Sequence, residues 1–138
     1  MELIKREGYI SKIQPFIDQS LIKVIIGQRR VGKSYILLQL IALIEENNPE
    51  VNIIYINKER YEFDAIKTYQ DLIDYVNAKI KENAKNYLFI DEIQDIDEFE
   101  RALRRIALMV NGVISLIGFY VLFLTLLLLS KIVKFVED

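Results

Sequence analysis

Short β-branched segments alternate with helical patterns over the first hundred residues, and this alternation limits the fold more than any other feature of the sequence. Each predicted strand is a short apolar run that ends at a polar residue or a glycine. The order strand, helix, strand, helix, strand, helix predicts an α/β fold with a parallel sheet and helices on both of its faces. The predicted strands are 21–26, 52–57 and 87–90, and the predicted helices are 7–17, 34–46 and two that follow Thr68 and Asp97.

Two capping patterns mark the starts of the later helices. Thr68 is followed three residues later by Asp71, and Asp97 is followed by Glu100. In such a pair the first side chain accepts a hydrogen bond from an amide of the first turn, and the second side chain returns one. We therefore expect N-caps at Thr68 and Asp97. The apolar faces expected to follow are Leu72, Ile73, Val76 and Ile80 in one helix and Phe99, Leu103, Ile106 and Ala107 in the other.

The absence of certain residue types limits the kinds of site and reaction that this chain can support. The 138-residue chain has neither Cys nor His, which excludes disulfide scaffolds, thiolate metal sites, thiol nucleophiles and imidazole bases. Its 18 Lys and Arg against 20 Asp and Glu give a formal net charge of −2, which argues against a dedicated nucleic-acid binder. Any chemistry therefore rests on carboxylates, Lys, Arg, hydroxyl groups and backbone amides.

The turn between the first predicted strand and the helix at 34–46 fits a phosphate-binding loop. Its sequence, GQRRVGKS, matches G-x-x-x-x-G-K-[ST]. Gly27 and Gly32 let the backbone wrap a phosphate, and the helix N-terminus that follows attracts anions. We expect Lys33 to reach the β- and γ-phosphates and the Ser34 hydroxyl to ligate Mg²⁺. The predicted phosphate-binding residues are Gly27, Gln28, Arg29, Arg30, Val31, Gly32, Lys33 and Ser34.

The strand predicted at 87–90 runs directly into two acidic residues, Asp91 and Glu92. A parallel strand ends at the edge of the sheet where ligands bind, so Asp91 is predicted to hold Mg²⁺ through a water molecule. Glu92 is predicted to polarise the attacking water, since the chain has no His to act as base. The predicted catalytic residues are Glu92 and Lys33, and the predicted metal ligands are Ser34 and Asp91.

Three arginines, Arg101, Arg104 and Arg105, lie on the last predicted helix. We interpret them as a solvated helix face, because charge clusters on helices are usually exposed. The alternative is that they supply a charge to the transition state in a neighbouring molecule.

These motifs resemble those of a known family. GQRRVGKS after a strand, followed by NYLFIDEIQDIDEFERALR, is similar to ATPases of the AAA+ superfamily that carry an N-terminal AAA domain and a separate C-terminal domain. The resemblance covers residues 4–108. It implies a P-loop NTPase fold of RecA/AAA+ type, ATP and Mg²⁺ as cofactors, and ATP hydrolysis. It also implies that another strand lies between the strand of the Walker A loop and the Walker B strand that ends at Asp91.

After residue 108 the sequence departs from that family, because neither a Thr-Gly-Ser-like sensor nor an arginine finger can be assigned. An arginine finger alone contributes about 10³–10⁵ in rate, so we expect ATP binding to survive better than hydrolysis. We divide the chain into the N-terminal part of an ATP-binding domain at residues 1–108 and a hydrophobic segment at 109–138. In this interpretation the domain is incomplete, truncated after the Walker B region.

The hydrophobic segment has three interpretations, because 25 residues from Ile106 to Ser130 carry no charge. The first is a transmembrane helix at 112–130, with the arginines before it keeping the ATPase on the cytoplasmic face. The second is a missing central strand at 113–117 followed by an apolar helix on the sheet. The third, favoured by the abrupt loss of family character, is a damaged reading frame.

These interpretations lead to different functions and places in the cell. The main hypothesis is a cytoplasmic ATP-binding domain whose partner is the nucleotide, with no specific nucleic acid evident and no protein partner identified. The alternatives are a membrane-anchored interaction protein that uses the nucleotide fold as a scaffold, and a non-functional gene fragment.

Overall fold

The computed structural model describes residues 7–17, 22–27, 33–118 and 132–136 of the chain. The strands in these ranges are β1 (Ile22–Gly27), β2 (Asn52–Asn57), β3 (Asn86–Asp91), β4 (Gly112–Gly118) and β5 (Ile132–Val136). The α-helices are α1 (Glu7–Ile13), α2 (Lys33–Asn47), α3 (Tyr69–Lys79) and α4 (Phe99–Ile106), and short 3₁₀ turns cover Gln14–Phe16, Tyr61–Phe63 and Ile93–Asp95. The three strands predicted from the sequence are confirmed, as are the helices predicted between them.

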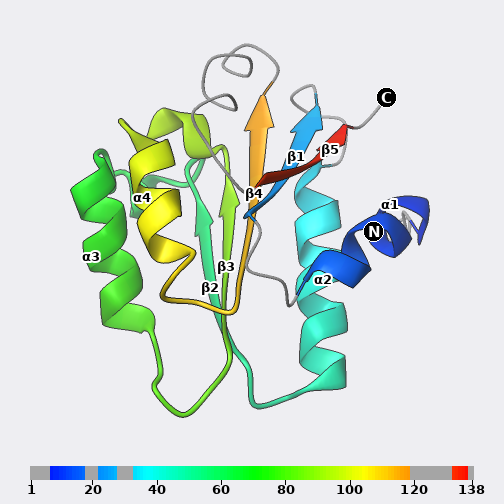
Figure 1. The fold of residues 1–138 in the computed structure, drawn as a ribbon. Coiled ribbons are helices and arrows are strands. Elements are labelled where there is room, and N and C mark those ends of the chain that lie inside the picture. The colour runs from blue at the N-terminus through cyan, green and yellow to red at the C-terminus, as the bar shows by residue number, and fades with distance from the viewer. Residues whose placement is uncertain (1–6, 18–21, 28–32, 119–131, 137–138) are drawn as a thin grey trace.

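The strands form one parallel sheet in the order β2-β3-β4-β1-β5. Ser115 of β4 pairs with Val24 of β1 on one side and with Ile90 of β3 on the other. The strand that the family resemblance implied between β1 and β3 is therefore β4. All the arrowheads in Figure 1 point towards the same edge, so the carboxyl ends of the strands gather there.

Helices cover both faces of the sheet, as the alternation predicts. Figure 1 shows α3 and α4 on one face and α1 and α2 on the other. The side chains of β3 alternate accordingly, since neighbouring strand residues face opposite sides. Leu88 and Ile90 pack in the core under α3 and α4, whereas Tyr87 and Phe89 pack in the core under α1 and α2. β3 is therefore buried on both faces.

The N-cap predicted at Thr68 is confirmed. The Thr68 hydroxyl accepts a hydrogen bond from the amide of Asp71 at 3.2 Å, and the Asp71 carboxylate accepts one from the amide of Thr68 at 3.1 Å. The helix that follows buries the apolar face expected of it, with Leu72, Ile73 and Val76 in the core.

The N-cap predicted at Asp97 is wrong. Glu98 occupies the cap position of α4 with a left-handed backbone, φ 55°, and its side chain makes no capping bond. The amide of Asp97 instead donates to the carbonyl of Lys67 at 2.8 Å, in a short bridge to the start of α3. This backbone pairing ties the starts of α3 and α4 together, and it uses the amide of Asp97 that a return bond from Glu100 would need.

The membrane helix predicted at 112–130 is wrong over its first seven residues, which form β4. A strand covered on both faces reads as a continuous apolar run, so its sequence looks like that of a membrane segment. The central strand expected at 113–117 is confirmed, whereas the apolar helix expected after it falls in part on residues 119–131, which lie outside the described ranges. The hydrophobic C-terminal helix is also contradicted at 132–136, which form β5 beside β1. Within the described ranges, no helix is long and apolar enough to cross a membrane.

Candidate functional site

Two of the predicted site residues end strands at the same edge of the sheet. Gly27 is the last residue of β1 and Asp91 is the last residue of β3, with β4 between them. Asp91 lies one residue beyond the level of Ser115 in the sheet register, and Gly27 lies three residues beyond it. Neighbouring strands are about 4.8 Å apart, so β1 and β3 run about 10 Å apart. The loop that follows Gly27 therefore begins close to Asp91.

Asp91 also lies on the face of the sheet that α2 covers. Asp91 shares its face with Tyr87 and Phe89, because strand side chains alternate with a period of two, and those two residues pack in the α2 core. α2 begins directly after the loop, with Lys33 and Ser34 as its first residues. The start of α2 therefore lies at the same edge and over the same face as Asp91 (Figure 1). The first amides of a helix lack partners within the helix and favour an anion.

The predicted phosphate loop is described only at its two ends. Gly27 ends β1, and the backbones of Lys33 and Ser34 form the first turn of α2. The other predicted members of the loop, Gln28, Arg29, Arg30, Val31 and Gly32, lie outside the described residues.

Asp91 is a buried carboxylate, 2% exposed. Its carbonyl accepts a hydrogen bond from the amide of Lys58 at 3.1 Å, which continues the pairing of Asn57 with Asp91 beyond the end of β2. On the same face, burial raises the pKa of the Tyr55 hydroxyl above its ordinary value, and the nearby charge of Asp91 raises this pKa further. Asp91 is thus a buried carboxylate at the edge of the sheet where α2 begins.

The donor set at this edge fits Mg²⁺ held together with a phosphate ligand. Mg²⁺ prefers oxygen ligands and is usually bound through one or two carboxylates and the phosphates of the substrate. Asp91 supplies one buried carboxylate, and Ser34 brings a hydroxyl-bearing residue to the first turn of α2. Mg²⁺ therefore suits this edge of the sheet.

Glu92 lies just beyond the end of β3, so the alternation of strand side chains does not set its direction. Its backbone is left-handed, with φ 60° and ψ 51°, a conformation that non-glycine residues adopt rarely and at a cost. The residue is nevertheless 4% exposed. Gln94 Nε2 donates a hydrogen bond to Glu92 Oε2. Gln94 was not among the predicted site residues, although an amide side chain two residues after the paired acids is a signal that could have found it.

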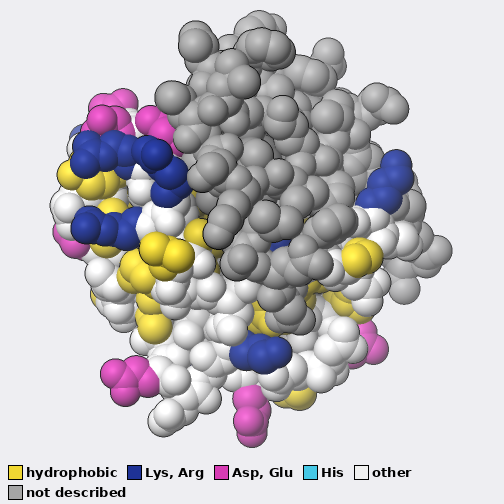
Figure 2. All heavy atoms as spheres, viewed as in Figure 1, with side chains coloured by type: hydrophobic (Ala, Val, Ile, Leu, Met, Phe, Trp, Pro, Cys, Tyr) yellow, Lys and Arg dark blue, Asp and Glu magenta, His cyan; other side chains and the backbone are white. Residues whose placement is uncertain are grey.

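The three arginines of α4 lie on the exposed side of that helix. Arg101, Arg104 and Arg105 are exposed, which agrees with the interpretation of a solvated helix face, and Figure 2 shows Lys and Arg side chains gathered over this part of the surface. With Tyr69 and Ile73 they line a pocket of about 380 Å³ between α3 and α4. The Arg101 guanidinium lies 4.3 Å from the Tyr69 ring centre and 3.4 Å from the Glu98 carboxylate.

The chain belongs to the AAA domain family, which matches residues 19–118. It therefore has the fold of a P-loop NTPase, and the family implies nucleotide binding in general. The match runs ten residues beyond residue 108, to the end of β4. The division of the chain at residue 108 stays a prediction.

Two uncharacterised proteins are similar to this chain over most of its length. An uncharacterised protein of Haemophilus influenzae is 32% identical over 118 residues, which cover 84% of this chain and 30% of that protein. An uncharacterised protein of Methanocaldococcus jannaschii is 33% identical over 112 residues, which cover 77% of this chain and 23% of that protein. The chain thus spans less than a third of the length of either relative.

Solved structures support the fold. Cdc6p from Pyrobaculum aerophilum superimposes with a TM-score of 0.63 at 12% identity, over 97% of this chain and 46% of that one. Rif2 from Saccharomyces cerevisiae superimposes with a TM-score of 0.57 at 13% identity, over 96% of this chain and 55% of that one. At such low identity the likeness concerns the fold alone.

Proposed function

We propose that this chain binds ATP together with Mg²⁺ at the carboxyl edge of its sheet and hydrolyses the nucleotide. The observation that carries the proposal is the placement of Gly27 and Asp91. They end two strands separated only by β4, and α2 begins over the face that Asp91 occupies. A loop that wraps phosphates and a carboxylate that reaches their metal need this arrangement.

In the proposed site, the loop from Gly27 to Ser34 holds the phosphates with its backbone amides and with the start of α2. Lys33 neutralises charge on the β- and γ-phosphates. Ser34 and Asp91 hold Mg²⁺, which when bound offsets phosphate charge as bond breaking begins. The arginines of the loop, Arg29 and Arg30, belong to the same proposed phosphate-binding segment.

Glu92 is the proposed general base. It follows the strand that ends at Asp91, and it is buried, 4% exposed. A carboxylate with little competing water can orient an attacking water molecule and accept its proton.

ATP hydrolysis and ATP affinity, measured side by side on three chains, test this proposal. Glu92→Gln removes the base and keeps the size of the side chain, so turnover should fall by about 10²-fold or more while ATP affinity stays within about twofold. Glu50→Gln makes the same change at an exposed turn before β2 and should leave both unchanged. Equal turnover in the wild-type and Glu92→Gln chains would refute the role of Glu92.

A further inference from the structure

We propose that Gln94 is a positioning residue for hydrolysis, which orients Glu92 through its amide nitrogen and the attacking water through its amide oxygen. This inference rests on the proposed function, because it assumes that Glu92 is the base. It adds a residue that the phosphate-loop and acidic motifs do not contain.

The first observation is the hydrogen bond between the two side chains. Gln94 Nε2 donates to Glu92 Oε2. An ionised carboxylate can only accept hydrogen bonds, so the amide must turn its NH₂ group towards it. The contact therefore fixes the orientation of the Gln94 amide as well as that of the Glu92 carboxylate.

The second observation is the other end of the same amide. Gln94 Oε1 is buried and accepts no hydrogen bond from any of the residues that the structure describes. Buried polar atoms almost always have a partner, so an exception needs a reason. Since Nε2 is committed to Glu92, Oε1 is an acceptor held beside the carboxylate and ready for a donor. A water molecule between the two groups would direct one hydrogen to Glu92 and the other to Gln94 Oε1.

The backbone holds this pair in place. Gln94 lies in the short 3₁₀ turn Ile93–Asp95, directly after β3. Ile93, directly before Gln94, and Ile96, two residues after it, are 0% and 1% exposed and belong to the core under α3 and α4. A side chain on such an anchored turn has little freedom, which is what the positioning of a reacting group requires.

In the proposed step the water oxygen bonds to the γ-phosphorus while the bond to the β–γ bridging oxygen breaks. The electron pair of the broken bond leaves on the β-phosphate of ADP. One water proton passes to the Glu92 carboxylate, and the other stays on the phosphate product after its hydrogen bond to Gln94 Oε1 is released. Gln94 neither gains nor loses a proton.

The test compares Gln94→Leu, which removes both amide functions at similar volume, with a matched control. Gln70→Leu removes the same kind of amide–carboxylate contact, because Gln70 Nε2 donates to Asp74 Oδ1 at 2.9 Å on the exposed side of α3. Two properties are measured with Mg²⁺ present. The first is the rate of ATP turnover, compared with the affinity for ATP. The second is the gain in ADP affinity when fluoroaluminate, a mimic of the transferring phosphoryl group, is added.

We expect Gln94→Leu to lose about 10²-fold in turnover, together with the affinity gain from fluoroaluminate, while the affinities for ATP and ADP and the melting temperature match those of Gln70→Leu. Gln94→Asn, which keeps the amide on a shorter stem, should recover part of both losses. The fluoroaluminate measurement does not depend on turnover, so it decides the matter even where hydrolysis is very slow.

The outcomes separate the two proposals. If Glu92→Gln abolishes turnover but Gln94→Leu behaves like Gln70→Leu, the positioning role is refuted and the proposed function stands. If Gln94→Leu lowers nucleotide affinity and melting temperature together with turnover, Gln94 is structural and the inference is also refuted. If Lys33→Ala leaves ATP and ADP binding unchanged, the proposed function itself fails.

Discussion

Gly27 and Asp91 end two parallel strands at one edge of the sheet, with β4 between them. The relationship is not visible locally, because the two residues are 64 positions apart in the sequence. It arises because β4 pairs with both β1 and β3 in parallel register. The order of the strands thus joins a glycine that opens a loop to a carboxylate that lies beneath the start of α2.

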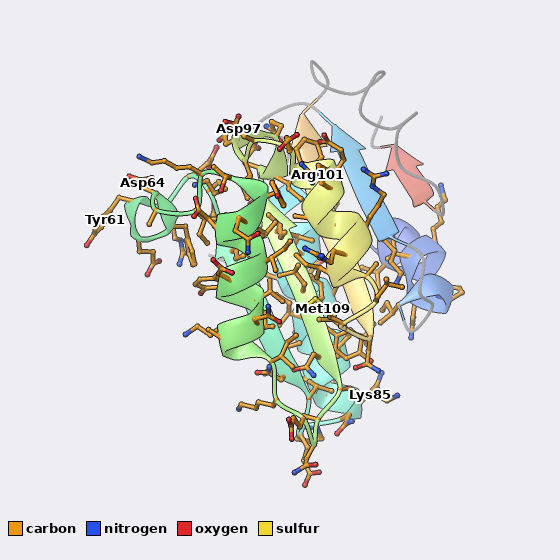
Figure 3. The ribbon with its side chains drawn as sticks, turned by 60° about the vertical axis from the view of Figure 1, so that its left-hand side comes forward. Tyr61, Asp64, Lys85, Asp97, Arg101 and Met109 are labelled. Carbon is orange, nitrogen blue, oxygen red and sulfur yellow. The ribbon has the colours of Figure 1, made fainter. Side chains whose placement is uncertain are left out.

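Replacing Asp91 should remove the dependence of nucleotide binding on Mg²⁺. In the wild-type chain, Mg²⁺ with ATP should raise the melting temperature more than ATP with a chelator, since a ligand at 100 times its Kd stabilises by about 2.7 kcal/mol. Asp91→Asn should lose the Mg²⁺-dependent part and keep the rest. Asp64→Asn is the control, on the exposed loop that projects away in Figure 3. A full Mg²⁺-dependent shift in Asp91→Asn would count against the metal role.

Replacing Thr68 should destabilise the domain without affecting nucleotide binding. The Thr68 hydroxyl accepts the amide of Asp71 at 3.2 Å and so caps α3. Loss of such a cap costs about 1 kcal/mol, so denaturant unfolding of Thr68→Ala should show that decrease in the free energy of unfolding. ATP affinity should stay the same, because the cap belongs to α3 and not to the proposed site. An unchanged free energy of unfolding would show that the cap contributes nothing.

The same cap predicts a pH dependence of stability. Hydrogen bonds from the backbone amides of Lys67 and Thr68 lower the pKa of Asp71 below its ordinary value. The ionised carboxylate therefore stabilises the fold above the unfolded pKa of about 3.9, and this contribution is lost as the pH falls through the folded pKa. The melting temperature of Asp71→Asn should lie below that of the wild type near neutral pH and approach it in acid. A difference in melting temperature between Asp71→Asn and the wild type that stays constant from neutral pH to acid would contradict the prediction.

Adding a single carbon at Gly112 should be costly. A β-carbon there would lie 2.6 Å from the carbonyl oxygen of Ile17 and 2.9 Å from Cδ1 of Tyr87. A backbone carbonyl cannot move aside as a flexible side chain can, so Gly112→Ala should lower the free energy of unfolding by about 1–3 kcal/mol, as overpacked cores do. Chemical denaturation measures this change. A stability equal to that of the wild type would show that the start of β4 has room to shift.

Local sequence patterns predicted much of the fold, but they predicted the strands β4 and β5 less well. The alternation of strands and helices and the cap at Thr68 depend on neighbouring residues, so they could be predicted from short windows. β4 resembles a membrane segment because both of its faces are covered, and β5 is defined by its pairing with β1 across a long stretch of chain. Asp97 is not the cap because α4 begins one residue later, and the amide of Asp97 pairs with Lys67, a contact that no local pattern reveals.

The candidate site likewise combines residues that motifs predict with features that depend on how the chain turns. The residue types at Gly27, Lys33, Asp91 and Glu92 could be predicted from motifs, since each motif reflects chemistry that needs those types. The left-handed backbone of Glu92 and its contact with Gln94 could not, because both depend on how the chain turns after β3.

Equilibrium binding of Mg²⁺–ATP by titration calorimetry tests the central claim most directly. Three chains are compared: the wild type, Lys33→Ala, and Lys81→Ala, which changes an exposed lysine in the turn before β3. Hydrogen bonds to charged groups contribute about 1.5–3 kcal/mol, so Lys33→Ala should bind about 10–100-fold more weakly, and Lys81→Ala should match the wild type. Equal affinity in all three chains, or no binding by the wild type, would contradict the account.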